Sequence, residues 1–125
     1  MKIAILMSTY NGQEYLNKQL KSISEQDVEA DVTVFIRDDG SSDGTLDIIR
    51  KWEKKLNIVF SSGVNSGPAL SFWKLLTDSK IQADYYAFCD QDDIWDKNKL
   101  SVAVSVLSSD KEANLYASNC RIINE

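Results

Sequence analysis

The chain has 125 residues, a hydrophobic fraction of 43%, a charged fraction of 26% and a net charge of −5, which predicts one soluble globular domain and excludes a disordered chain. The negative charge argues against nucleic-acid binding, and the absence of histidine excludes Ser-His and Cys-His nucleophiles, imidazole-ligated zinc and histidine acid–base catalysis within this chain. Because no stretch reaches roughly 18 apolar residues and no signal-peptide pattern is present, we expect a cytoplasmic protein, with membrane association arising only in a longer enzyme.

Short apolar runs alternate with segments of helical periodicity along the chain. The expected elements, in order, are strand 3–7, helix 13–26, strand 32–36, helix 45–54, strand 57–60, helix 70–76, strand 85–89, helix 96–107 and strand 115–118. This alternation predicts an α/β fold over residues 1–125, with a mainly parallel sheet and helices on both faces.

Four loops follow the carboxyl ends of the expected strands, and they contain the acidic and glycine-rich segments of the sequence. They are residues 8–12, 37–43, 62–68 and 90–95. In parallel sheets, ligands bind beyond these strand ends. The coincidence predicts a single site at one edge of the sheet.

The last of these loops places Asp90, Asp92 and Asp93 within four positions. Two carboxylates about 4 Å apart repel by roughly 4 kcal/mol at an effective dielectric constant of about 20, so a bound cation would stabilise the cluster. Oxygen ligands suit Mg²⁺, Mn²⁺ or Ca²⁺. The alternative is a solvated turn that caps the helix expected from Asp96.

The loop after the second strand contains Asp38 and Asp39, followed by small residues that allow a ligand to approach the backbone. One of these carboxylates could accept a hydrogen bond from a base or ribose, whereas Asp43 or Ser42 is explained as the cap of the next helix. An EF-hand is excluded, because Arg50 occupies the position of the bidentate carboxylate. The dinucleotide and P-loop fingerprints are also absent, so a cation must help to hold phosphates. The reaction class implied is transfer away from a nucleoside diphosphate.

Four segments together resemble family 2 glycosyltransferases in order, spacing and placement at strand ends. They are Ser8-Thr9-Tyr10-Asn11-Gly12, the run from Arg37 to Thr45, Asn65-Ser66-Gly67 and Asp90-Gln91-Asp92-Asp93-Ile94-Trp95. The resemblance implies a GT-A fold, the Rossmann-like fold of nucleotide-diphospho-sugar transferases. It also implies an inverting transfer of a sugar from a nucleotide donor, dependent on Mg²⁺ or Mn²⁺.

The resemblance also assigns roles to individual residues. Thr9 and Tyr10 would line the base pocket, Asp39 would hydrogen-bond the base, and Asp92 would bind the metal together with Asp90. The remaining nucleotide-binding positions would be Asn11, Asp38, Asn65 and Gly67, with Asp90 also near the ribose. Asp93-Ile94-Trp95 would shape the pocket floor, although Trp95 fits core packing equally well.

The Asp-Gln-Asp-Asp-Ile-Trp segment and Ser71-Phe72-Trp73 resemble the rhamnosyltransferase-like branch that builds surface polysaccharides. This likeness implies a UDP- or dTDP-sugar donor and a polysaccharide or glycolipid acceptor. Family members need a carboxylate base beyond the D-x-D half, which we expect after Glu125. Residues 1–125 would then be the N-terminal, donor-binding part of a longer enzyme, inactive alone.

Three further expectations complete the sequence-based account. Cys89 and Cys120 occupy apolar, strand-like segments and are expected to be free structural thiols. An uncovered sheet edge would favour dimerisation of this chain. Two other functions stay open: a non-catalytic nucleotide-binding α/β module, and a nucleotidyltransferase, for which residues 8–12 lack the expected basic residues.

Overall fold

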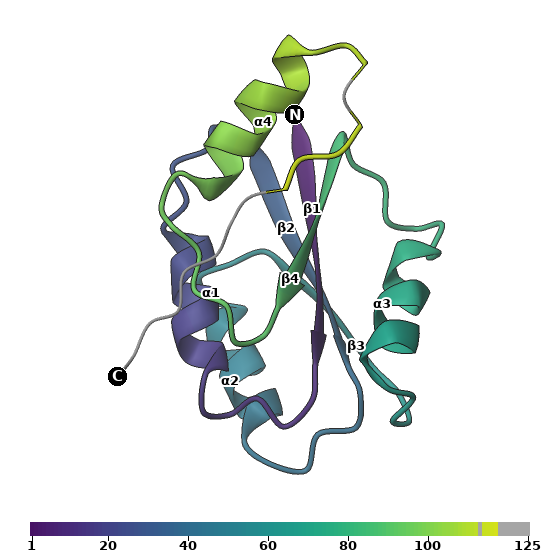
Figure 1. Ribbon diagram of the computed structural model, residues 1–125. Helices are drawn as coiled ribbons and strands as arrows, with labels where there is room; N and C mark the ends of the chain where they lie inside the picture. The colour runs from purple at the N-terminus through teal and green to yellow at the C-terminus, as the bar shows by residue number, and fades with distance from the viewer. Residues whose placement is uncertain (113, 118–125) are drawn as a thin grey trace.

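The computed structural model describes residues 1–112 and 114–117, and its strands and helices alternate along the chain (Figure 1). In order, the elements are β1 (Lys2–Thr9), α1 (Leu16–Ser24), β2 (Asp31–Asp38), α2 (Thr45–Trp52), β3 (Ile58–Ser62), α3 (Pro68–Leu76), β4 (Tyr85–Asp90) and α4 (Lys99–Ser109). The α/β alternation predicted from the sequence is confirmed.

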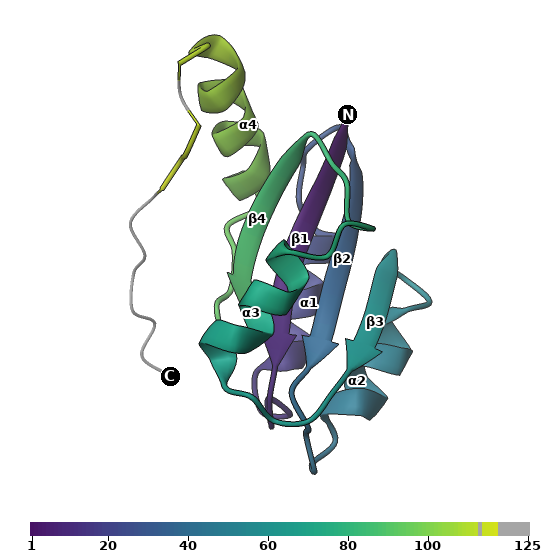
Figure 2. The ribbon, with the colours of Figure 1, turned by 90° about the vertical axis from the view of Figure 1, so that its right-hand side faces the viewer.

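The four strands form one sheet in the order β3-β2-β1-β4, and every neighbouring pair is parallel (Figure 2). Thr9 at the end of β1 is level with Asp38 of β2, and Ser8 is level with Asp90 of β4. The loops that follow these three strands therefore begin side by side at one edge of the sheet.

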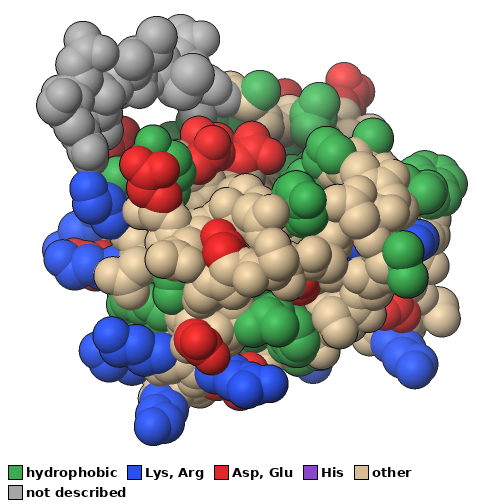
Figure 3. Space-filling view, turned by 90° about the horizontal axis from the view of Figure 1, so that it is seen from below, with side chains coloured by type: hydrophobic (Ala, Val, Ile, Leu, Met, Phe, Trp, Pro, Cys, Tyr) green, Lys and Arg blue, Asp and Glu red, His purple; other side chains and the backbone are tan. Residues whose placement is uncertain are grey.

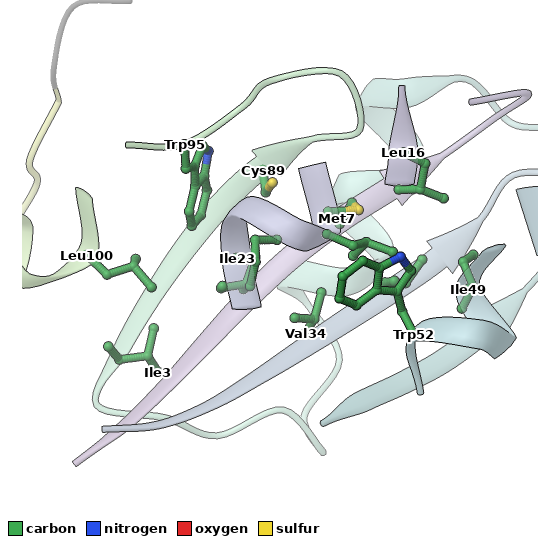
Figure 4. Packing of buried hydrophobic residues seen from close by; sticks show 13 residues of the cluster. Ile3, Met7, Leu16, Ile23, Val34, Ile49, Trp52, Cys89, Trp95 and Leu100 are labelled. Atoms are coloured by element: carbon green, nitrogen blue, oxygen red, sulfur yellow. The ribbon is translucent and has the colours of Figure 1, made fainter. Parts of the chain in front are cut away.

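Helices cover both faces of the sheet, as predicted, with α1, α2 and α4 on one side and α3 on the other (Figure 1). β1 is buried on both faces because its alternate side chains point to opposite sides. Ile3, Ile5 and Met7 join the larger core cluster (Figure 4), whereas Ala4 and Leu6 pack on the α3 side. A strand buried in this way reads as a continuous apolar run.

Helix α1 packs through Leu16, Leu20 and Ile23, which are spaced by about one turn and are almost inaccessible to solvent. Gln19 is also fully buried on this helix. Its side-chain amide donates to the Cys89 sulfur and, at 3.1 Å, to the carbonyl oxygen of Asp90. A buried polar group of this kind is stabilised by its partners, and here it joins α1 to the end of β4.

Two helices begin three residues later than the sequence predicts, because a turn precedes each of them. The amides of Tyr15 and Leu16 both bond to the Gly12 carbonyl, at 3.1 and 2.9 Å, so the chain turns before α1 starts. Before α4, the Lys99 amide bonds to the Asp96 carbonyl at 3.0 Å. Local turn bonds of this type have no clear signature in hydrophobic periodicity.

The strand expected at 115–118 is wrong for residues 115–117, which have no regular secondary structure, and residue 118 lies outside the described part. A strand is stable only when it pairs with a neighbour. Leu115 is 85% exposed and lies on no sheet, so its apolar character alone was a misleading signal.

Cys89 is a buried free thiol, as expected, and Cys120 lies outside the described residues. Burial raises the pKa of the Cys89 thiol well above its usual range. Over residues 1–112 and 114–117, no helix combines the length and the apolar character that crossing a bilayer requires.

Candidate functional site

A cleft of about 530 Å³ lies at the carboxyl ends of the strands. Its lining residues are Ser8, Tyr10, Asp39, Asn65, Gly67, Pro68, Phe72, Asp90, Gln91 and Asp92. Strands β2 and β3 lie on one side of β1 and β4 on the other, so the strand order reverses between β1 and β4. Such a switch point is the usual ligand site of an open parallel sheet.

The same edge of the molecule has an uneven distribution of charge. Seen from below, acidic side chains lie across this face, whereas Lys and Arg side chains lie mainly toward its margin (Figure 3). The acidic side chains on this face favour a cation or a hydrogen-bond donor as ligand.

Asp38 organises the loop after β2 through a fully engaged carboxylate. Its Oδ1 accepts from Thr9 Oγ1 at 2.8 Å and Ser41 Oγ at 2.6 Å, and its Oδ2 accepts from the amides of Gly40 and Ser41 at 3.2 and 2.8 Å. These four donors fill the acceptor positions of a carboxylate. Asp38 is 1% exposed and does not line the cleft; it joins the end of β1 to the following turn.

Asp39 is equally buried, but its carboxylate faces the cleft. Oδ1 accepts from Arg37 Nη1 at 2.7 Å and from the amide and hydroxyl of Ser66 at 2.9 and 3.2 Å. Among the described residues, Oδ2 accepts a hydrogen bond only from the Gly67 amide, at 2.9 Å. A carboxylate oxygen has room for a second donor, so Oδ2 can accept one more hydrogen bond from a ligand.

The pKa of Asp39 is lowered although the side chain is buried. Burial alone would raise it, but the hydrogen bonds from Arg37, Ser66 and Gly67 outweigh that effect. Asp39 is therefore ionised at neutral pH, and an ionised carboxylate can only accept. The group that it selects from a ligand must be an N–H or O–H donor.

Arg37 connects Asp39 to α3 and to the loop after β3. Its Nη1 also donates to Ser71 Oγ on α3 at 2.9 Å, and its Nη2 to the carbonyl of Val64 at 3.3 Å. Ser71 Oγ accepts a further bond from Ser8 Oγ at 2.7 Å. Sequence reasoning missed Arg37 and Ser71 as site residues, although a charged residue at the end of an apolar strand was an available signal.

The acidic loop after β4 contains a carboxyl group whose pKa is raised. Burial is the largest cause for Asp90, followed by the negative charges of Asp93 and Asp92 and by a hydrogen bond with Asp93. Helix α4 has Asn98 at its N-cap, without a side-chain cap bond. The N-cap position is therefore none of Asp90, Asp92 and Asp93, and the capping part of that explanation is wrong, although residues 91–92 do form a turn in which Asp92 is exposed.

The loop residues fit a divalent cation in chemistry and in number. Asp90 and Asp92 line the cleft together and offer hard oxygen ligands, and their mutual repulsion would be offset by positive charge. Within the described ranges, no group of three or more acidic, cysteine or histidine side chains is placed to hold a metal. A cation there would take its other ligands from water and from a substrate phosphate, as Mg²⁺ usually does.

The sequence-predicted residues divide into those that line the cleft and those that support it. Tyr10, Asp39, Asn65, Gly67, Asp90 and Asp92 line it. Thr9, which is bonded to Asp38, is fully buried, and Asn11 accepts a bond from the Ser42 amide at 2.9 Å. Sequence reasoning assigned no site role to Ser8, Pro68 and Phe72, which also line the cleft.

The pocket floor expected from Asp93-Ile94-Trp95 is wrong, because the lining ends at Asp92. Trp95 is 7% exposed and packs in the core with Ile23 and Leu100 (Figure 4). Its backbone amide donates to Ser22 Oγ on α1 at 3.1 Å, which directs the chain away from the cleft. The core-packing interpretation of Trp95 is therefore confirmed.

Asp43 supports the start of α2, although the N-cap position is Gly44 and not, as the sequence suggested, Asp43 or Ser42. Its Oδ1 accepts from the amide of Thr45 at 3.0 Å, at the start of α2, and its Oδ2 from the amide of Gln13 at 3.2 Å. Burial would raise the pKa of Asp43, but the hydrogen bond from the Thr45 hydroxyl, together with those from the amides of Thr45 and Gln13, lowers it overall. Asp43 fixes the start of α2 and does not line the cleft.

A second cleft of similar size, about 560 Å³, lies at the opposite end of the sheet. Its lining includes Lys2, Asp31, Val32, Val59 and Ala83. It lies at the amino ends of the strands, where parallel sheets rarely bind ligands. The chemistry of the sequence motifs is concentrated at the carboxyl-end cleft, which we take as the candidate site.

Comparison with known proteins shows the family to which the sequence is similar. Residues 4–124 match the model of glycosyl transferase family 2. The dTDP-rhamnosyl transferase RfbG of Shigella flexneri is 40% identical over 90% of this chain and 40% of its own length. The abequosyltransferase RfbV of Salmonella typhimurium is 33% identical over 93% of this chain and 35% of its own.

A solved structure with the same fold is S. aureus TarS 1–349 in complex with UDP-GlcNAc. It has a TM-score of 0.80 and 31% identity, covering 87% of this chain and 32% of that chain. The chain thus spans about two fifths or less of the length of these relatives.

Proposed function

This chain belongs to glycosyl transferase family 2, and from that premise we propose that it is the donor-binding part of an inverting, metal-dependent glycosyltransferase. The donor is a UDP- or dTDP-sugar, and the acceptor is a polysaccharide or glycolipid. The donor proposal draws support from RfbG, named a dTDP-rhamnosyl transferase, and from TarS, solved with UDP-GlcNAc.

One observation carries the proposal. A single cleft is lined by a buried, ionised carboxylate with a free acceptor position, Asp39, and by a carboxylate pair suited to a cation, Asp90 and Asp92. A nucleoside diphosphate needs both features, because its base presents N–H donors and its phosphates carry negative charge. The two features lie on opposite sides of β1, on loops that follow β2 and β4.

The base half of the site consists of Tyr10 and Asp39. Asp39 Oδ2 accepts from an N–H of the base, and the half-exposed Tyr10 ring offers an apolar surface beside it. An imide N–H, as in uracil and thymine, satisfies the acceptor-only carboxylate. A base without a donor at that position would cover the remaining acceptor position of Asp39 Oδ2 without a hydrogen bond, which costs affinity.

The diphosphate half of the site consists of Asp90 and Asp92. A divalent cation held there neutralises the charge that develops on a departing diphosphate. Asp92 is assigned to the metal, and Asp90, the last residue of β4, to the metal and to the ribose beside it. We assign the catalytic base to none of the described residues.

Calorimetric titration with UDP and dTDP, with and without Mn²⁺, tests the proposal on the wild-type chain and on Asp92→Asn. Mn²⁺ should raise the affinity by about tenfold or more, equivalent to about 1.4 kcal/mol, and Asp92→Asn should abolish this enhancement. Glu29→Gln is the matched control, because it removes one negative charge from an exposed residue between α1 and β2, at the other end of the sheet.

The other two functions predict different results in the same titration. A non-catalytic nucleotide module predicts binding that is independent of Mn²⁺ and unchanged in Asp92→Asn. A nucleotidyltransferase predicts tighter binding of a nucleoside triphosphate than of UDP-sugar. Absence of all binding to a folded wild-type chain would contradict the proposal.

A further inference from the structure

The side-chain amide of Gln91 forms two hydrogen bonds with the backbone of Tyr10, across the switch point of the sheet. Oε1 accepts from the Tyr10 amide at 2.9 Å, and Nε2 donates to the Tyr10 carbonyl at 3.0 Å. Because one planar amide satisfies both backbone groups of a single residue, it fixes their orientation as well as their distance. Gln91 lies directly between Asp90 and Asp92, whereas Tyr10 belongs to the base half of the site.

Gly12 provides the space that this pairing needs. Its φ is not among the positive values found in the described residues, so the backbone does not require glycine there. A Cβ at Gly12 would lie 2.3 Å from Oε1 and 2.7 Å from Cδ of Gln91. Any larger residue would therefore displace the Gln91 amide from Tyr10.

The acidic loop is also held on its other side, by helix α1. Gln19 Nε2 donates to the Asp90 carbonyl at 3.1 Å, and the Trp95 amide donates to Ser22 Oγ at 3.1 Å. These bonds fix the two ends of the loop to the protein core. The pairing of Gln91 with Tyr10 acts at a different place, because it sets the distance between the acidic loop and the loop after β1.

We propose that Gln91 is a positioning residue that fixes the spacing between the base half and the diphosphate half of the site. The inference rests on the proposed function. When one end of a nucleoside diphosphate is bound, the other end meets its partner at an effective concentration set by that spacing. Loosening the two loops lowers this concentration and leaves the affinity of each half for its own fragment unchanged.

The test compares two ligands on the same variants. The affinity for UDP with Mn²⁺ is measured by calorimetry, and the affinity for uridine, which engages the base half alone, by displacement of UDP. Gln91→Met keeps the length of the side chain and removes both hydrogen bonds. It should weaken binding of UDP with Mn²⁺ by about fivefold or more, the effect of two modest hydrogen bonds, and leave uridine affinity within about twofold.

Gln13→Met is the matched control. Gln13 Oε1 accepts from the Gly44 amide at 2.6 Å, so it also forms an amide-to-backbone bond at this edge, but away from the acidic loop. The control should leave the ratio of the two affinities unchanged. Thermal unfolding of each variant checks that the fold is retained.

Gly12→Ala provides a second test through the partner residue. It should reproduce the loss seen in Gln91→Met, because the added methyl group displaces the amide. In a chain that already carries Gln91→Ala, Gly12→Ala should cause no further loss of affinity for UDP with Mn²⁺. The two substitutions remove the same contact, so their effects do not add.

The outcomes separate the two proposals. Unchanged binding of UDP with Mn²⁺ in Gln91→Met, with metal-dependent binding in the wild type, overturns the inference and leaves the proposed function intact. An equal loss of affinity for UDP and for uridine also overturns the inference, because Gln91 would then only stabilise the base pocket. A folded wild-type chain that binds neither ligand refutes the proposed function, and the inference with it.

Discussion

Arg37 and Asp39 form a buried ion pair beside the cleft, with 2.7 Å between Arg37 Nη1 and Asp39 Oδ1. The two side chains are 8% and 3% exposed. Charges removed from water in this way depend on each other, because either one alone would be left without compensation. Arg37 is the second-last residue of β2 and Asp39 directly follows the strand, so the ion pair lies where β2 ends.

Replacing Arg37 with Met should destabilise the fold strongly. The variant leaves the Asp39 carboxylate buried without its cationic partner and leaves Ser71 without one donor. Removal of one partner from a buried pair costs roughly 3 kcal/mol or more. Urea denaturation measures the loss, and Arg50→Met, an exposed substitution on α2, is the control. A loss below about 1 kcal/mol would contradict the structural role given to Arg37.

The free energy of unfolding should fall in acid partly because of Asp39. Its pKa in the folded protein is below the ordinary value of 3.8, so between these two values the unfolded chain binds more protons. The stabilisation is present above pH 3.8 and is lost as the pH falls through the lower folded pKa. Asp39→Asn should show a shallower decline than the wild type below about pH 4. If the free energy of unfolding fell equally steeply with pH in both proteins, the lowered pKa of Asp39 would be refuted.

Asp90 should have the opposite effect, because its pKa is raised in the folded protein. As the pH rises past 3.8, the unfolded chain releases this proton first, so the folded state loses stability until the raised pKa is passed. Asp90→Asn should therefore be more stable than the wild type at pH 7, by up to about 0.5 kcal/mol, the range of exposed charge pairs.

Thermal unfolding at pH 3 and pH 7 checks this prediction, and the gain should be absent at the lower pH. Glu29→Gln is again the control for a simple change in net charge. Lower stability of Asp90→Asn at pH 7 would show that the carboxylate makes a net favourable contact in the folded protein.

Gly67→Ala should weaken the fold through the backbone alone. Gly67 has φ +87°, and a Cβ there would meet no atom within 4 Å. The expected cost is about 1–3 kcal/mol, because φ +87° with ψ +158° is essentially confined to glycine. Donor affinity should fall too, since the Gly67 amide donates to Asp39 Oδ2. Gly67→Asn should be no milder, because ψ is +158° and Asn shares the side-chain clash that confines this region to glycine. Chemical denaturation measures the stability of both variants. Stability equal to that of the wild type would contradict the prediction.

The sequence predicted those parts of the fold that depend on local pattern. β1 was identified because a strand buried on both faces leaves a continuous apolar run, and the placement of the site followed from the common edge of parallel strands. The strand at 115–118 was predicted from the same kind of apolar run, but such a run cannot show whether a pairing partner is present.

The supporting contacts of the site could not be predicted, because they join residues distant in the sequence. Ser8 bonds to Ser71 across 63 positions, and Tyr10 to Gln91 across 81. No periodicity records such pairs. The same limit explains Trp95, whose position in the core depends on its contact with α1 and not on the acidic residues beside it.

The most direct test of the central claim is a crystal structure of this chain with UDP and Mn²⁺. We expect the base beside Tyr10 and Asp39, with the metal bound by Asp92 between the acidic loop and the diphosphate. Nucleotide bound instead in the second cleft, beside Lys2 and Asp31 at the amino ends of the strands, would contradict the account, as would a metal bound away from Asp90 and Asp92.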